Sequence, residues 1–133
     1  MRPADFDHIV EMFAGFGPVA VRRMFGGAGI FAGGLMIGIL DEGVVYLKAD
    51  EITRTEFERE GLRPFVYASR QGERALVSYW RMPERLYDEP EELARWAAAA
   101  LACARRAASR KPAGKARRGS RGKSKRKSDA MRR

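Results

Sequence analysis

The feature that most constrains this chain is the uneven distribution of its large apolar side chains. Every Phe, Trp and Tyr lies between Phe6 and Trp96, and after Ala108 the only large apolar residue is Met131. A segment with so little apolar surface cannot offset the conformational entropy that it would lose on folding. The sequence therefore predicts one folded domain over residues 1–108 and a disordered tail over residues 109–133.

Formal charge divides the chain at nearly the same place. Up to Ala104 there are 12 Lys and Arg against 16 Asp and Glu, which gives a formal charge of −4. From Arg105 onward there are 14 Lys and Arg and a single acid, Asp129, which gives a formal charge of +13. The net charge of +9 for the whole chain is therefore set by the tail, and the two parts need separate functional explanations.

Cysteine content and the absence of long apolar segments indicate the compartment. Cys103 is the single cysteine, so an intrachain disulfide cannot form. The first residues lack the apolar segment of a signal peptide, and no apolar run approaches the roughly 20 residues of a membrane span. We therefore expect a cytoplasmic protein without a membrane partner.

Apolar periodicity and turn residues predict the order of helices and strands. Three helices are expected, each with an aspartate that can cap its start, at Asp5, Asp50 and Asp88. The expected strands are residues 19–31, with a turn or bulge at the glycines of residues 26–29, then 35–40, 44–48, 64–67 and 75–80. This order predicts a two-layer α+β domain, α-β(3)-α-β(2)-α, in which helices cover one face of a mainly antiparallel sheet.

Several blocks of the domain are distinctive and follow one another at compatible spacing. They are residues 23–31 (RMFGGAGIF), 34–38 (GLMIG), 45–50 (VYLKAD), 64–67 (PFVY) and 78–81 (SYWR). Together they resemble the N-terminal domain of the TfoX/Sxy family over about residues 6–104. The resemblance implies a secretion-chaperone-like fold and a role without catalysis in regulating genes of competence for DNA uptake. It also implies a stand-alone domain, because the basic tail takes the place of the family's helical C-terminal domain.

The glycine-rich block and its neighbours are the candidate functional surface of the core. These residues belong to the family motif and form a possible surface for a partner. They are Arg22, Arg23, Met24, Phe25, Gly26, Gly27, Gly29 and Lys48. Arg22 and Arg23 point to opposite faces of a strand, so at most one of them joins Lys48 in an anion or partner site. The alternative is a solvated sheet edge at which these cations prevent aggregation. A dinucleotide-binding loop fits the glycines less well, because Gly33 and Gly34 end the segment in which its helix would begin.

The remaining chemistry-bearing residues are scattered, so we expect no catalytic residue, metal site or cofactor. His8 is the only histidine, and one His with one distant Cys cannot form a zinc site. Strand alternation places Tyr79 and Trp80 on opposite faces, so one of them is expected in the core rather than in a base-stacking platform. Cys103 is expected to be a buried or half-buried thiol beside the apolar stripe of the last helix.

The tail carries the strongest physical indication of function. Its cations alternate with Gly, Ala and Ser, and no aromatic residue interrupts them. Such a segment can neutralise phosphates and release counterions, but it cannot stack on bases or present fixed donors to base edges. We therefore predict sequence-independent binding of nucleic acid by Lys111, Lys115, Arg117, Arg118, Arg121, Lys123, Lys125, Arg126 and Lys127.

Two interpretations of the whole chain stay open. In the first, the core is a regulator-like adaptor that binds a protein partner or itself, and the tail holds nucleic acid. In the second, the chain is a protein-binding or dimerising module whose tail solubilises it or contacts acidic protein or membrane surfaces. The resemblance also implies a homodimer, because related folds commonly pair.

Overall fold

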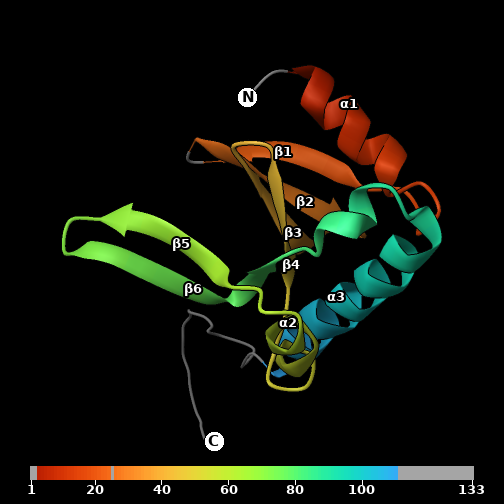
Figure 1. The fold of residues 1–133 in the computed structure, drawn as a ribbon. Coiled ribbons are helices and arrows are strands. Elements are labelled where there is room, and N and C mark those ends of the chain that lie inside the picture. Colours follow the sequence, from red (N-terminus) through yellow and green to blue (C-terminus); the bar gives the residue numbers. More distant parts are fainter. Residues whose placement is uncertain (1–2, 25, 111–133) are drawn as a thin grey trace, which may run out of the picture.

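The computed structural model describes residues 3–24 and 26–110 of the chain. Its elements follow in the order α1 (Pro3–Met12), β1 (Ala20–Met24), β2 (Gly27–Ala32), β3 (Leu35–Asp41), β4 (Val44–Lys48), α2 (Arg54–Arg59), β5 (Pro64–Ser69), β6 (Gly72–Arg81), the short 3-10 helix η1 (Glu84–Tyr87) and α3 (Pro90–Arg110). The predicted α+β class is confirmed (Figure 1). Phe25 and the tail from Lys111 onward, with every predicted nucleic-acid contact, lie outside the described residues.

The strands form one antiparallel sheet of six strands in the order β1-β2-β3-β4-β6-β5. The expected turn or bulge at residues 26–29 is wrong for most of that segment. Gly26 has a positive φ of 86°, but Gly27 and Gly29 lie in β2 and pair with Met24 and Arg22 of β1. The glycines therefore add a strand to the predicted five, and the register shift on β2 falls later, between Ile30 and Phe31.

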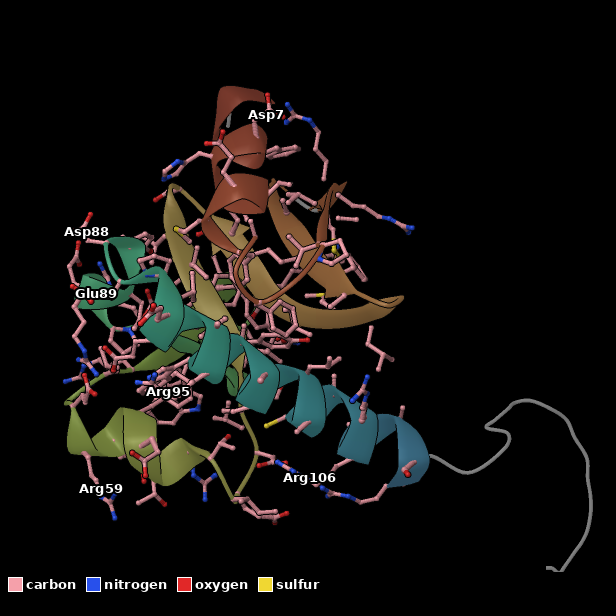
Figure 2. All side chains as sticks on the ribbon, turned by 90° about the vertical axis from the view of Figure 1, so that its right-hand side faces the viewer. Asp7, Arg59, Asp88, Glu89, Arg95 and Arg106 are labelled. Carbon is pink, nitrogen blue, oxygen red and sulfur yellow. The ribbon has the colours of Figure 1, made fainter. Side chains whose placement is uncertain are left out.

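The helices cover one face of the sheet and bury a single core against it. In Figure 1 α1 and α3 lie on the same side of the strands, and in Figure 2, turned by 90°, they stand in front of the sheet. The predicted apolar stripe of α3 is buried at Leu93, Ala97, Ala100 and Ala104, spaced four, three and four residues apart. Figure 2 also shows charged side chains spread over the outer side of the helices, including Arg95.

The helix starts differ from those that the aspartates predicted. α1 begins at Pro3, so Asp5 lies inside the first turn rather than at the cap. α2 begins only at Arg54, because a turn separates it from Asp50. α3 begins at Pro90, so Glu89 rather than Asp88 precedes its first residue, and a proline suits this position because no helical N–H is needed there.

The end of α3 also lies beyond the expected boundary of the domain. Ser109 and Arg110, which were assigned to the tail, are the last two residues of this helix. The guanidinium of Arg110 lies 3.7 Å from the carboxylate of Glu51, which supports the final turn from the body of the domain. These two residues therefore belong to the last helix of the described part of the chain.

The β5–β6 hairpin extends beyond the rest of the sheet. β4 pairs with β6 only at Tyr79–Arg81, whereas β5 pairs with β6 as far as Ser69 and Gly72 at the hairpin turn. Figure 1 shows the hairpin projecting away from the helices. We call residues 64–77 the arm; because no third strand flanks it, much of its surface is exposed.

Candidate interaction surface

The face of the sheet opposite the helices is lined by apolar and aromatic side chains. Strand residues that alternate with those of the core point toward this face. Ring contacts link β4 to β5 along it, with Tyr46 4.9 Å from Phe65 and Phe65 6.3 Å from Tyr67, measured between centroids. We call it the helix-free face; its side chains include Arg22, Met24, Phe31, Met36, Ile39, Tyr46, Lys48, Phe65, Tyr67, Leu76 and Tyr79.

A groove of about 530 Å³ lies on the helix-free face. One wall comes from β1–β3 and the other from the arm, although these strands stand at opposite ends of the sheet order. The sheet is therefore strongly curved. The groove is lined mainly by apolar side chains, with Asp41 as its one carboxylate, and its volume lies in the range that holds a small molecule or a few side chains of a partner. Its lining residues are Met24, Gly27, Ala28, Met36, Ile39, Asp41, Phe65, Tyr67, Ala68 and Leu76.

The glycines of the motif shape this face instead of holding a phosphate. A Cβ atom on Gly29 would lie 2.7 Å from the sulfur of Met24 and 2.8 Å from Cε1 of Phe31. A Cβ atom on Gly27 would lie 2.7 Å from the backbone carbonyl oxygen of Leu40. Both glycines lie within a strand, so the helix N-terminus that a dinucleotide loop requires is not formed at them.

The three candidate cations of the core are held apart, each against an aromatic ring. The guanidinium of Arg22 lies 5.2 Å from the ring centroid of Phe31 on the helix-free face. The guanidinium of Arg23 lies 5.2 Å from the ring centroid of Phe6 in α1, on the face of the sheet that the helices cover. Lys48 lies 4.8 Å from the ring of Tyr79.

The strands that carry these cations are not neighbours in the sheet. Because β2 and β3 separate β1 from β4, the structure does not bring Arg22 next to Lys48. Contacts of a cation with a ring face are favourable by themselves, which gives each side chain a structural role.

Tyr79 and Trp80 lie on opposite faces, and both are buried. Trp80 belongs to the core, as expected of one of the pair, and its indole N–H donates to the carbonyl oxygen of Val77 at 2.8 Å. Tyr79 lies on the helix-free face with only 7% of its surface exposed, and burial raises the pKa of its hydroxyl. Neither ring is available as a stacking platform for bases.

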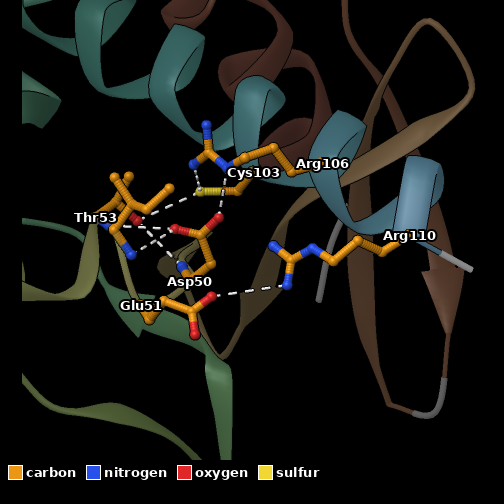
Figure 3. A network of polar contacts seen from close by, with 7 residues as sticks. Asp50, Glu51, Thr53, Cys103, Arg106 and Arg110 are labelled. Carbon is orange, nitrogen blue, oxygen red and sulfur yellow. Dashed lines mark hydrogen bonds and ion pairs between the residues drawn. The ribbon is translucent and has the colours of Figure 1, made fainter.

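A polar network joins the segment before α2 to α3 (Figure 3). The Asp50 carboxylate accepts hydrogen bonds from the Arg106 guanidinium at 2.8 Å and from the backbone N–H groups of Ile52 and Thr53 at 3.0 and 3.2 Å. The Thr53 hydroxyl accepts in return from the N–H of Asp50 at 3.1 Å. The hydrogen bond from Arg106, with those from Thr53 and Ile52, lowers the pKa of Asp50 from 3.8 to about 2.

Sequence reasoning missed this network. The reciprocal bonds of Asp50 and Thr53, three residues apart, were the local indication available for it. Cys103 is buried, as expected, and its sulfur lies 3.3 Å from the Thr53 hydroxyl. Burial raises the pKa of the Cys103 thiol, so the thiolate that a nucleophile requires is disfavoured.

Residues 3–24 and 26–110 contain no cluster of potential metal ligands and no membrane-spanning helix. No group of three or more His, Cys, Asp or Glu in this part of the chain could hold a metal ion. Within the same residues, no helix combines the length and the hydropathy needed to cross a bilayer. His8 is an exposed residue of α1.

Comparison with known proteins identifies one family. The family model described as the TfoX N-terminal domain matches residues 11–104. The match begins in α1 and ends in α3, so it spans the whole sheet, α2 and the groove. No curated protein matches the chain.

Proposed function

Because the chain belongs to the TfoX N-terminal domain family, we propose that it is a regulatory or adaptor protein without enzymatic activity. Its core binds a protein partner or a second copy of the chain, and its tail binds nucleic acid without sequence specificity. The family resemblance links this role to the regulation of competence genes. The helix-free face, with its apolar groove, is the part of the core suited to the protein contact.

The observation that carries this proposal is the segregation of charge. The chain up to Ala104 is formally −4, whereas the residues from Lys111 onward hold 11 Lys and Arg against the single acid Asp129. Two cations of the core have structural partners, since Arg22 lies against the ring of Phe31 and Arg106 is bonded to Asp50. Phosphate binding is therefore a task for the tail, and such contacts fix no base sequence.

The chemistry of the core supports a role without catalysis. A nucleophile needs an adjacent base or a lowered pKa, and Cys103 has a raised pKa and lies buried against Thr53 and Arg106. His8 belongs to the exposed side of α1 and does not line the groove. Asp41 is the one titratable carboxyl group among the groove residues.

A second candidate function is a protein-binding or dimerising module whose tail only increases solubility. The observation that favours it is the apolar surface exposed on the arm, where Val66 and Val77 are 47% and 56% exposed. Single exposed apolar residues are ordinary, but neighbours on one hairpin form a patch of the kind that partners cover. The two candidates differ in whether the tail binds nucleic acid.

The test is the affinity of the full chain for two DNA duplexes of unrelated sequence, measured by fluorescence anisotropy across a salt series. We expect equal affinities for the two duplexes and a steep fall with salt. Replacing Lys125 and Lys127 by Gln should lower the magnitude of the log–log salt slope by about 1.8, because each phosphate contact contributes about 0.9. The matched control replaces the exposed Arg59 and Arg95 of the core and should leave the slope unchanged. Salt-insensitive binding, or a strong preference for one duplex, contradicts the proposal.

A further inference from the structure

The two edge strands of the sheet are protected differently. β1 forms one edge and carries Arg22 and Arg23. β5 forms the other edge and has no charged residue between Pro64 and Ser69. Edge strands in natural proteins are commonly protected by charge, because their unpaired N–H and C=O groups otherwise pair with another strand. The uncharged edge of β5 is the one suited to such pairing.

Exposed apolar surface is concentrated beside this edge. Five large hydrophobic residues are exposed in the described part of the chain, and three of them, Val66, Tyr67 and Val77, lie on the arm. β5 is hydrogen-bonded to β6 alone. The arm thus offers apolar side chains together with the open edge of a strand, and a partner strand would use both at once.

The sequence of β5 is chemically symmetric about Val66. Phe65 and Tyr67 flank Val66, and Pro64 and Ala68 flank these aromatic residues in turn. If two copies of β5 pair antiparallel with Val66 opposite Val66, each Phe65 faces Tyr67 of the other copy. Aromatic cross-strand pairs stabilise a sheet, and the arrangement satisfies both edges equally, as a two-fold dimer interface requires.

Two-fold symmetry limits the registers that β5 can adopt. Residues directly opposite each other on antiparallel strands point to the same face, so the two-fold axis must pass between a residue and its own copy. A centre at Phe65 or at Tyr67 leaves a single aromatic pair across the interface, whereas the centre at Val66 forms two. The aromatic pairs therefore favour the register centred on Val66.

We infer that β5 pairs antiparallel with β5 of a second copy, centred on Val66, and joins the two sheets into one. This inference deepens the self-association that the proposed function assigns to the core. A dimer of this kind carries two basic tails, so nucleic acid bound by one tail is held near the other at high effective concentration. Dimerisation and nucleic-acid binding therefore use different parts of the chain.

The first test is the oligomeric state of the full chain, measured by sedimentation equilibrium. We expect a dimer for the natural sequence and a Val66→Lys variant whose dimer affinity is weaker by about a hundred-fold, because each interface then opposes two cations. The matched control is Ile52→Lys, since Ile52 is 64% exposed at a site before α2, and its dimer should be unchanged. Circular dichroism establishes that both variants are folded. A monomeric natural chain, or a Val66→Lys variant that dimerises normally, overturns the inference.

The second test addresses the register. Because Cys103 is buried, Val66→Cys places one accessible thiol on each chain. Cross-strand neighbours lie within the Cα separation that a disulfide spans, so mild oxidation should yield a covalent dimer, whereas Ile52→Cys should not. A dimer that Val66→Cys does not link would overturn the register. A chain that stays monomeric can still bind DNA through its tail. A monomeric chain that binds DNA would therefore overturn this inference alone, and a dimer that binds no DNA would overturn the proposed nucleic-acid function alone.

Discussion

Arg106 of α3 donates a hydrogen bond to the carboxylate of Asp50 at 2.8 Å, joining two residues that are 56 positions apart. The side chain of Asp50 is 16% exposed and that of Arg106 is 34% exposed, so the pair is partly shielded from water. The same carboxylate accepts the N–H groups of Ile52 and Thr53. One side chain thus holds the turn between β4 and α2 against the last helix.

Removing the charge of Asp50 should destabilise the domain measurably. Asp50→Asn keeps an oxygen that can accept the N–H groups of the turn but loses the ionic bond with Arg106. We expect a loss of about 1–2 kcal/mol in the free energy of unfolding, discounted because Arg106 is partly exposed. Urea denaturation measures this. The matched control is Glu51→Gln, whose partner Arg110 is 3.7 Å away and 60% exposed, and it should cost less than about 0.5 kcal/mol. Equal losses in the two variants would contradict the assigned role of Asp50.

The same pair predicts a pH dependence with a defined sign. The pKa of Asp50 is lowered in the folded state, from 3.8 to about 2, so its contribution is fully present above 3.8 and is lost as the pH falls toward 2. Arg85 also lowers the pKa of Glu60 and Glu92, which adds to acid destabilisation in any variant. The measurement is therefore the difference in unfolding free energy between the natural chain and Asp50→Asn. This difference should shrink between neutral pH and pH 2, and a constant difference would show that the carboxylate charge is not responsible.

Gly27 should tolerate no side chain, although its backbone conformation is an ordinary strand. A Cβ atom there would meet the backbone oxygen of Leu40 at 2.7 Å, and a paired strand cannot easily move aside. Gly27→Ala is expected to cost about 1–3 kcal/mol in thermal or urea unfolding. The control is Gly15→Ala, where the nearest atom is the Pro90 carbonyl oxygen at 3.8 Å, and we expect little change. Two variants of equal stability would refute the close packing of β2 on β3.

The sequence predicted the features of this fold that depend on local patterns. The stripe from Leu93 to Ala104 repeats at helical spacing, so α3 and its buried face follow from the sequence directly. β2 was misread because Gly27 and Gly29 are typical of turns when considered alone. In the strand they occupy positions where neighbouring atoms approach too closely for a Cβ, and sequence spacing does not report such distances.

The candidate site depends on long-range arrangement and was therefore less predictable. The groove joins Met24 and Met36 to Phe65, residues whose proximity requires the curvature of the whole sheet. The relative placement of Arg22 and Lys48 likewise depends on the sheet order, in which two strands separate β1 from β4. The basic tail, by contrast, is evident from composition, and its proposed function rests on charge rather than on folded geometry.

The central claim is that the tail binds nucleic acid and the core does not. The most direct test is to measure the affinity for DNA of a chain that ends at Arg110. This truncation keeps all of α3 and the contact of Arg110 with Glu51, so the core should unfold at the same temperature as in the full chain. We predict that its affinity for duplex DNA at low salt falls by at least about a hundred-fold, because the phosphate contacts reside in the removed segment. A folded truncation that binds DNA as tightly as the full chain would contradict the proposed function and place the nucleic-acid site on the core.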